Sequence, residues 1–147
     1  MTKTTTKLQQ LLNKGTTYFK QTPESELSRK VSVDKWSKKE ILGHLIDSGI
    51  NNLQRFTEIQ FVEKPYRIRT YHQNELVQAN DYQNAETKEI VDFWNALNHR
   101  ILNVMKQQTE ETLNYVIELD TDNSCDLRFL MTDYVEHMEH HLKQILK

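Results

Sequence analysis

Glycine and proline are so scarce in this sequence that only a fold built from long, regular elements suits it. The chain contains three glycines and two prolines among 147 residues. Folds with many short strands need frequent turns, and these two residues supply most of the backbone conformations that turns require. The scarcity therefore argues against a β-rich fold and favours long helices. A mean hydropathy of −0.76 fits helices whose outer faces are solvated.

The length of the chain indicates how many domains it forms, and its charge indicates which classes of partner it does not favour. A chain of 147 residues has the size of one ordinary domain, so we expect a single domain over residues 1–147. The net charge of −2 leaves no basic excess, which argues against binding to nucleic acid or to anionic lipid. The sequence shows no long apolar run of a membrane span or signal peptide. The single cysteine cannot form an internal disulfide and fits a reducing compartment, so we expect a cytoplasmic protein.

Apolar residues recur at helical spacing in four stretches of the chain. The first stretch follows a threonine-rich start that we expect to be frayed, and Thr22 and Pro23 after it predict a short helical turn. The four predicted helices are one whose apolar stripe starts at Leu8 and that ends near Gln21, one from Lys38 to about Val62, one from Thr87 to Gln108, and one from Cys125 to Leu146. Four amphipathic helices with one apolar face each predict an all-α four-helix bundle.

The start of the second helix carries the clearest signal. Ser37 and Glu40 form a capping box, in which a hydroxyl and a carboxylate satisfy backbone N–H groups at the helix start. Trp36 and Ile41 are spaced to form the accompanying hydrophobic staple. These four residues fix the beginning of the helix at Lys38.

Two connections between the predicted helices are unusual. Residues Glu63 to Ala85 hold Pro65 and several aromatics without a sustained period, with a helical turn expected around Gln73 to Gln78. Connections of this length are usually functional or cover something. The sequence leaves open whether Tyr71 and Tyr82 close over a site or pack against the bundle. Residues Glu110 to Ser124 predict only irregular structure.

The six histidines are unevenly spread, and three of them crowd into the last predicted helix. At about 100° per residue, His141 lies about 40° from His137 on the same face and one turn further along. Both lie at the edge of the apolar face of this helix, whereas His140 points toward solvent. An i, i+4 pair at the edge of a core is a geometry that can hold one metal ion.

A fourth histidine lies on the second helix. His44 borders the apolar face of that helix, on a polar stripe with Ser48, Asn51 and Arg55. If the second and fourth helices are neighbours, His44 and the two edge histidines of the last helix can converge. The remaining histidines, His72 and His99, we interpret as bystanders.

Three neutral imidazoles suit Zn²⁺, and also Ni²⁺ or Fe²⁺, with at least one position left for water or substrate. An ion held in this way can activate a water or a thiol. The site is not of the H-E-x-x-H type, because Met138 stands where that motif needs glutamate. The alternative is that these histidines are ordinary surface residues on polar helix faces, where histidine is common.

Four further side chains are candidates for the chemistry. Asp47 and Asp133 lie one turn from a histidine, so each can orient an imidazole or a bound water, or is a plain solvated carboxylate. Arg55 can bind an anionic substrate group, or is an ordinary surface arginine. Cys125 stands at the predicted start of the last helix, where the dipole lowers a thiol pKa; the alternative is an inert small side chain.

Three stretches of the chain together form a recognisable pattern. They are W-S-K-K-E-I-L-G-H-L-I-D-S (Trp36 to Ser48), Y-H-Q-N-E-L-V-Q-A-N-D-Y (Tyr71 to Tyr82) and D-Y-V-E-H-M-E-H-H-L-K-Q-I (Asp133 to Ile145). With these stretches the chain resembles the DinB/YfiT-like superfamily. The resemblance runs from about Leu8 to the C-terminus. It implies a four-helix bundle with up-down-down-up connectivity, often dimeric. The long connection between the second and third helices fits the crossover that this topology requires.

The most specific part of the resemblance is H-x-x-H-H-x-x-Q, from His137 to Gln144, together with a histidine early in the second helix. In the superfamily, one histidine of the second helix and two of the fourth bind a divalent metal. The resemblance therefore implies His44, His137 and His141 as the metal ligands.

Members of that superfamily are mostly described as metal-dependent hydrolases, and some branches are S-transferases or isomerases that use a low-molecular-weight bacterial thiol. The resemblance thus implies a divalent-metal protein that acts on a small molecule as a hydrolase or a thiol-dependent S-transferase, and that forms a homodimer. The alternative is a noncatalytic helical module with a structural or vestigial metal site. No residue pattern identifies the substrate.

Overall fold

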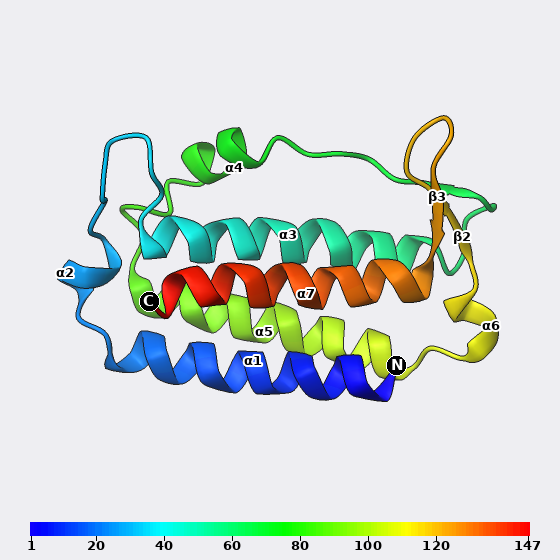
Figure 1. The fold of residues 1–147 in the computed structure, drawn as a ribbon, viewed down its shortest axis with the longest axis horizontal. Coiled ribbons are helices and arrows are strands. Elements are labelled where there is room, and N and C mark those ends of the chain that lie inside the picture. Colours follow the sequence, from blue (N-terminus) through cyan, green and yellow to red (C-terminus); the bar gives the residue numbers. More distant parts are fainter.

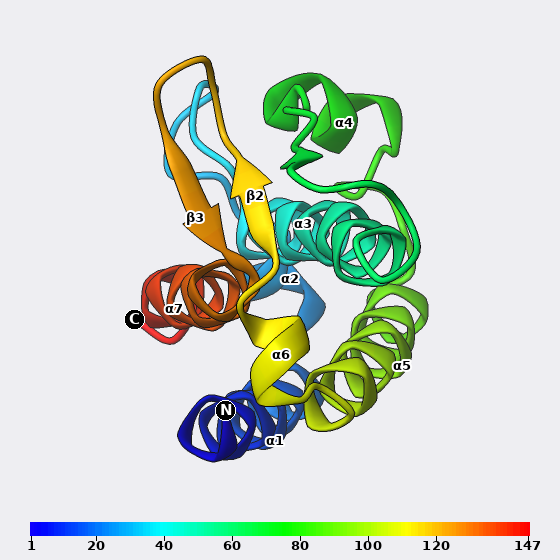
Figure 2. The same ribbon diagram turned by 90° about the vertical axis from the view of Figure 1, so that its right-hand side faces the viewer.

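Four long helices form a bundle in the computed structural model, which describes residues 1–147 (Figure 1). Helices α1 and α7 run in one direction and α3 and α5 run in the other, so the connectivity is up-down-down-up. Neighbours in contact are α3 with α5, α5 with α1, α1 with α7, and α7 with α3 (Figure 2). The helices are α1 (Thr2–Gln21), α3 (Lys38–Glu58), α5 (Thr87–Lys106) and α7 (Leu127–Ile145). The predicted four-helix bundle is confirmed.

A crossover returns the chain along the whole bundle between α3 and α5, because these two helices are adjacent and parallel (Figure 1). The crossover spans residues 59–86 and holds the short strand β1 (Tyr66–Arg67) and helix α4 (Gln73–Ala79). Helix α4 lies over α3. As a result, α3 is covered on its outer side too, and its residues Leu42 to Gly49 are buried without interruption.

The ends of three predicted helices need correction. The second helix ends at Glu58 rather than near Val62, because residues 59–61 tighten into three-residue turns ahead of Pro65. The last helix begins at Leu127 rather than at Cys125, because Asp126 caps it by accepting from the Phe129 amide. The threonine-rich start is not frayed but forms the first turns of α1. The turn α2 (Glu24–Leu27) has Pro23, not Thr22, at its N-cap.

The region predicted to be irregular, residues 110–124, holds regular structure. It contains the turn α6 (Glu110–Leu113) and the strand β2 (Val116–Glu118), and β3 (Ser124–Asp126) follows. Strand β2 lies between β1, which is parallel to it, and β3, which is antiparallel to it. This small sheet stands at one end of the bundle (Figure 1) and joins the crossover to the segment that precedes α7. Strands of two or three residues are too short to show a period of two in the sequence.

The core lies between the four helices and includes the predicted inward faces. Trp94 is fully buried, and its ring packs edge-to-face on Phe19. The capping box of Ser37 and Glu40 is present with both of its hydrogen bonds. No helix combines the length and apolar character needed to cross a membrane.

Gly43 of α3 lies against the ring of Tyr82 from the crossover. A Cβ atom at Gly43 would stand 2.0 Å from the Tyr82 ring, far inside contact distance. Tyr82 is itself buried, and its hydroxyl donates to Asp47 Oδ1 at 2.7 Å. The ring therefore cannot move aside without breaking this bond, and the crossover sits on α3 only because this position lacks a side chain.

We predict that Gly43→Ala destabilises the protein by about 2 kcal/mol, the usual cost of overpacking a tight site. In an ordinary helix interior the same change would stabilise by up to about 1 kcal/mol. Urea unfolding followed by circular dichroism measures the difference. Asn103→Ala, at an exposed position of α5, is the control and should change stability by less than about 0.5 kcal/mol. A Gly43→Ala protein as stable as the parent would show that Tyr82 does not hold the crossover on α3.

Candidate metal centre

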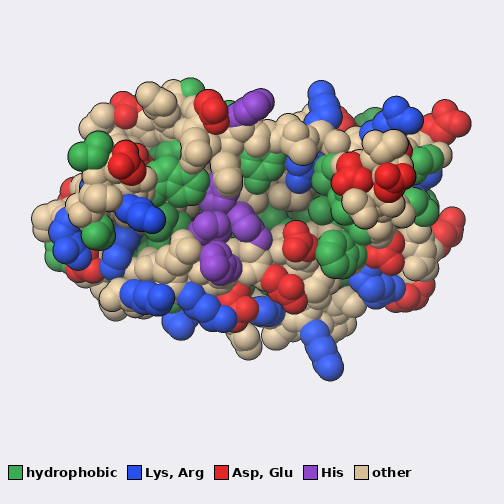
Figure 3. All heavy atoms as spheres, turned by 45° about the horizontal axis from the view of Figure 1, so that its top comes forward, with side chains coloured by type: hydrophobic (Ala, Val, Ile, Leu, Met, Phe, Trp, Pro, Cys, Tyr) green, Lys and Arg blue, Asp and Glu red, His purple; other side chains and the backbone are tan.

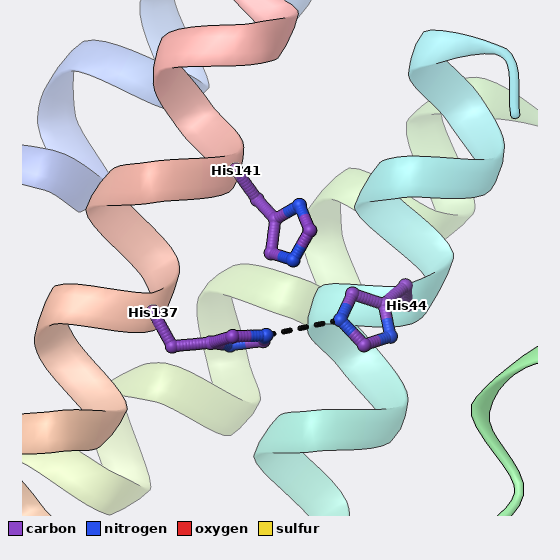
Figure 4. Close-up of side chains that lie close together, drawn as sticks. All are labelled: His44, His137 and His141. Atoms are coloured by element: carbon purple, nitrogen blue, oxygen red, sulfur yellow. Dashed lines mark hydrogen bonds between the residues drawn. The ribbon is translucent and has the colours of Figure 1, made fainter.

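Three histidines from two neighbouring helices converge at the surface of the bundle (Figure 4). His44 comes from α3, and His137 and His141 come from consecutive turns of α7. One nitrogen of each ring lies within 4.8 Å of the others. His44 is buried, and the other two rings are partly exposed. The space-filling view shows histidines gathered in a depression of this face (Figure 3).

The spacing of these nitrogens suits a metal ion. His44 Nε2 and His137 Nε2 are 3.1 Å apart. Two nitrogens bound to one tetrahedral ion at about 2.0–2.1 Å would be about 3.3 Å apart. The two rings therefore need to move very little to share an ion. No carboxylate or thiol joins the group.

The ring of His44 hydrogen-bonds to His137 through Nε2, and packing alone holds its other side. Trp36 lies beside it, with ring centroids 5.1 Å apart and planes tilted by 33°. His44 Nδ1 is buried and has no hydrogen-bond partner. Sequence reasoning assigned Trp36 to a hydrophobic staple and missed this contact, because only the folded chain brings the indole over an imidazole eight residues away.

Gln144 orients His141, a role that the sequence analysis did not assign. His141 Nδ1 donates to Gln144 Oε1 at 2.9 Å, which leaves His141 Nε2 free to bind an ion. The amide of Gln144 donates in turn to His140 Nε2 at 3.1 Å. His140 is exposed and lies outside the ligand group, as predicted. The spacing of three and four residues on one helix was the available signal for this network.

Burial keeps the three imidazoles neutral. It lowers the pKa of His44 to about 4, and the nearby rings of His141 and His137 act in the same direction. The pKa of His137 also falls to about 4, chiefly through burial. Burial lowers the pKa of His141 as well, although its bond to Gln144 opposes the change. Neutral imidazole is the form that binds a metal, so the site is ready for an ion at neutral pH.

The two candidate aspartates do not hydrogen-bond to the histidines. Asp47 faces the crossover, where its Oδ1 accepts from Tyr82 and from Asn80. Its Oδ2 is buried without a partner, and burial raises its pKa. Asp133 is exposed at the surface of α7 and makes no hydrogen bond. Tyr82 thus packs on α3 through Asp47 and does not close over the histidines.

The other candidates also lie outside the ligand group. Arg55 stands further along α3, where it contacts the crossover. Cys125 is in strand β3 rather than in the last helix, and burial together with nearby acidic groups raises its pKa. A helix start would instead lower the pKa of a thiol. The raised pKa of Cys125 therefore favours the interpretation as an inert thiol. His72 and His99 are exposed and lie outside the ligand group, in line with their interpretation as bystanders.

The buried neutral histidines predict a loss of stability in acid for the metal-free protein. The unfolded chain binds protons on these imidazoles below a pKa of about 6.5, whereas the folded chain resists protonation until about pH 4. Their full contribution to stability is therefore present above about pH 6.5 and is lost as the pH falls toward 4. Urea unfolding at pH 7.5, 5.5 and 4.5 should show this decline.

A matched pair of variants isolates the cause. In His137→Asn the decline from pH 7.5 to 4.5 should be smaller than in the parent by roughly 1–2 kcal/mol. His99→Asn, at an exposed position of α5, should follow the parent curve. An equal loss of unfolding free energy in all three proteins would mean that His137 takes up its proton at the same pH in the folded and the unfolded chain.

Comparison with known proteins identifies the family of the chain. The model of the DinB superfamily matches residues 7–145 of the chain. A search of curated proteins finds no significant match. Among solved structures, YfiT from Bacillus subtilis, described as a probable metal-dependent hydrolase with an unusual four-helix bundle topology, has a TM-score of 0.79 and 22% identity over 97% of this chain and 83% of its own.

Two further structures share the fold at lower identity. A mycothiol-dependent maleylpyruvate isomerase has a TM-score of 0.71 and 9% identity; the match covers 95% of this chain but 58% of the isomerase. A DinB-like protein from Bacillus cereus has a TM-score of 0.62 and 12% identity over 92% of this chain and 81% of its own. With a family model that spans nearly its whole length and the bundle topology that its sequence led us to expect, this chain belongs to the DinB superfamily.

Proposed function

We propose that the protein is a metal-dependent enzyme in which His44, His137 and His141 bind a divalent ion, and that it acts on a small molecule as a hydrolase or a thiol S-transferase. The observation that carries the proposal is the convergence of three neutral imidazole nitrogens within 4.8 Å at an accessible face of the bundle. Zn²⁺, Ni²⁺ or Fe²⁺ suits such a set. When bound, the ion supplies Lewis acidity, which lowers the pKa of a water or a thiol that reaches it.

The side chains around the ion fix what it can bind. Three neutral ligands leave the full charge of a divalent ion uncompensated, so the site attracts an anionic ligand such as a thiolate. Burial of His44 under Trp36 keeps solvent from one side of the centre, while the partly exposed His137 and His141 leave the other side accessible. Gln144 would hold His141 through its Nδ1, which leaves Nε2 free for an ion.

Both reaction types have support among the similar structures. YfiT is described as a probable metal-dependent hydrolase, and the isomerase depends on the thiol mycothiol. A hydrolase needs a group that accepts a proton from water, and the ligand group contains no carboxylate that does so. A thiol is more acidic than water, so its deprotonation depends less on a neighbouring base. We therefore favour thiol S-transfer over hydrolysis for this site.

A noncatalytic bundle with a structural ion is the second candidate. The observation that favours it is the lack of a hydrogen bond from either candidate aspartate, Asp47 or Asp133, to the histidines. A structural ion would be retained tightly and would raise the melting temperature without offering an exchangeable position. A catalytic ion would bind small thiols or anions directly.

We predict that untagged protein purified without chelator carries nearly one transition-metal ion per chain and that His141→Ala loses it. Loss of one of three ligands leaves two imidazoles, too few to retain the ion through purification. Inductively coupled plasma mass spectrometry measures the content.

Two variants on the same helix serve as controls. His140→Ala should keep the metal, because His140 lies outside the ligand group. Gln144→Ala should bind it with about tenfold lower affinity, because His141 loses the group that orients it. A parent protein that contains no metal and binds none of the three ions when they are added would contradict both candidate functions.

The proposed active form is a homodimer, on the basis of the family resemblance alone. The exposed apolar side chains offer surface for self-association, among them Phe61, Phe93 and Phe129. Light scattering at micromolar concentration should give about twice the chain mass of 17.6 kDa. A single species of the chain mass would refute the dimer and leave the metal centre unaffected.

A further inference from the structure

Arg55 of α3 is a partly buried cation without an acidic partner. It forms no salt bridge with any carboxylate of the chain. Two of its five N–H groups are engaged, one with Asn52 Oδ1 and one with the carbonyl of Arg69. The ring of Tyr71 lies under the guanidinium, 5.5 Å from centroid to Cζ. Burial lowers the pKa of Arg55, so the folded chain bears the cost of a charge that nothing on the protein neutralises.

A cavity of about 380 Å³ opens beside this guanidinium. Its wall contains two arginines, several neutral polar groups and no carboxylate: the residues are Asn51, Gln54, Arg55, Tyr66, Arg69 and Thr70. Glu58, outside this wall, accepts from the Tyr66 hydroxyl and the Gln54 amide, and it forms a long ion pair with Arg69 at 3.9 Å. The cavity therefore presents positive charge and free N–H groups to whatever enters it.

The cavity lies on the same side of α3 as the histidines. Arg55 follows His44 by 11 residues, which is close to three full turns, so the two side chains leave the helix within about 20° of each other. Their Cα atoms are roughly 16 Å apart along the axis, and the arginine side chain leans back toward the helix start. Ser48 and Asn51 occupy the turns between them.

We propose that Arg55, together with Arg69 and Thr70, binds an oxyanion, a carboxylate or a phosphate, carried by a small molecule whose other end reaches the histidines. A planar guanidinium with three free N–H groups is suited to bidentate contact with such a group. The oxyanion site stands on Arg55 and its cavity alone. The reach to the histidines rests on the proposed function, and it identifies the substrate as an elongated molecule with an anionic end.

The experiment titrates the protein with sodium acetate and, separately, with sodium phosphate, and follows the backbone amide signals of Thr70 and Tyr71 by ¹⁵N–¹H spectroscopy. We expect a saturable shift with at least one of the two anions, and the tighter anion identifies the group. In Arg55→Gln the affinity should fall at least tenfold, because a charged hydrogen-bonding partner is lost. The affinity of Arg55→Lys should lie between those of the parent and of Arg55→Gln, because lysine keeps the charge but lacks the planar guanidinium.

Two controls separate this site from other effects. Arg67→Gln removes an exposed arginine of the same crossover that already pairs with Glu118, and it should bind the anion as the parent does. His141→Ala should also bind as the parent does, so a failed metal site leaves this result standing. Shifts that stay linear with concentration in the parent, or equal affinity in Arg55→Gln folded as judged by circular dichroism, would overturn the proposal.

Discussion

The parallel, adjacent placement of α3 and α5 is the constraint on which the rest of the structure depends. Two parallel neighbours require a return segment as long as the bundle, and here that segment runs along the outside of α3. It covers the outer side of the first half of α3, where residues Leu42 to Gly49 are buried without interruption. Polar side chains of α3 that face the crossover find partners there: Asp47 accepts from Tyr82, and Arg55 donates to the carbonyl of Arg69.

The histidine centre shows the same balance between burial and pairing. His44, Asp47 and Trp94 each bury a polar atom without a hydrogen-bond partner. For His44 the cost of burial is limited because the ring stays uncharged. Burial lowers the pKa of the His44 imidazole, so the ring is neutral at neutral pH. Its Nε2 faces the Nε2 of His137, and neutral imidazole is the form that can bind a metal. The burial that is predicted to destabilise the metal-free protein in acid is thus also what suits these histidines to an ion at neutral pH.

The sequence predicts most of this architecture because its signals are local. The capping box at Ser37 and the 3.6-residue period of the apolar positions act within one helix, and the positions of His137 and His141 follow from the same period. What it could not reveal depends on contacts between distant segments. Trp36 over His44, Tyr82 against Gly43 and the two- to three-residue strands all require the folded chain. Cys125 was misplaced because Asp126, its neighbour, is the residue that caps α7.

The small sheet at the end of the bundle decides where the chain tolerates changes of length. Ile117, in the middle of β2, is fully buried, while both of its neighbours in the strand reach solvent. One residue inserted within β2 would turn Ile117 outward and shift β1, and with it the crossover that carries Arg69. The same insertion between Leu119 and Asn123 would only enlarge an exposed hairpin loop. We therefore expect insertions and deletions among related chains to occur in that loop rather than in β2.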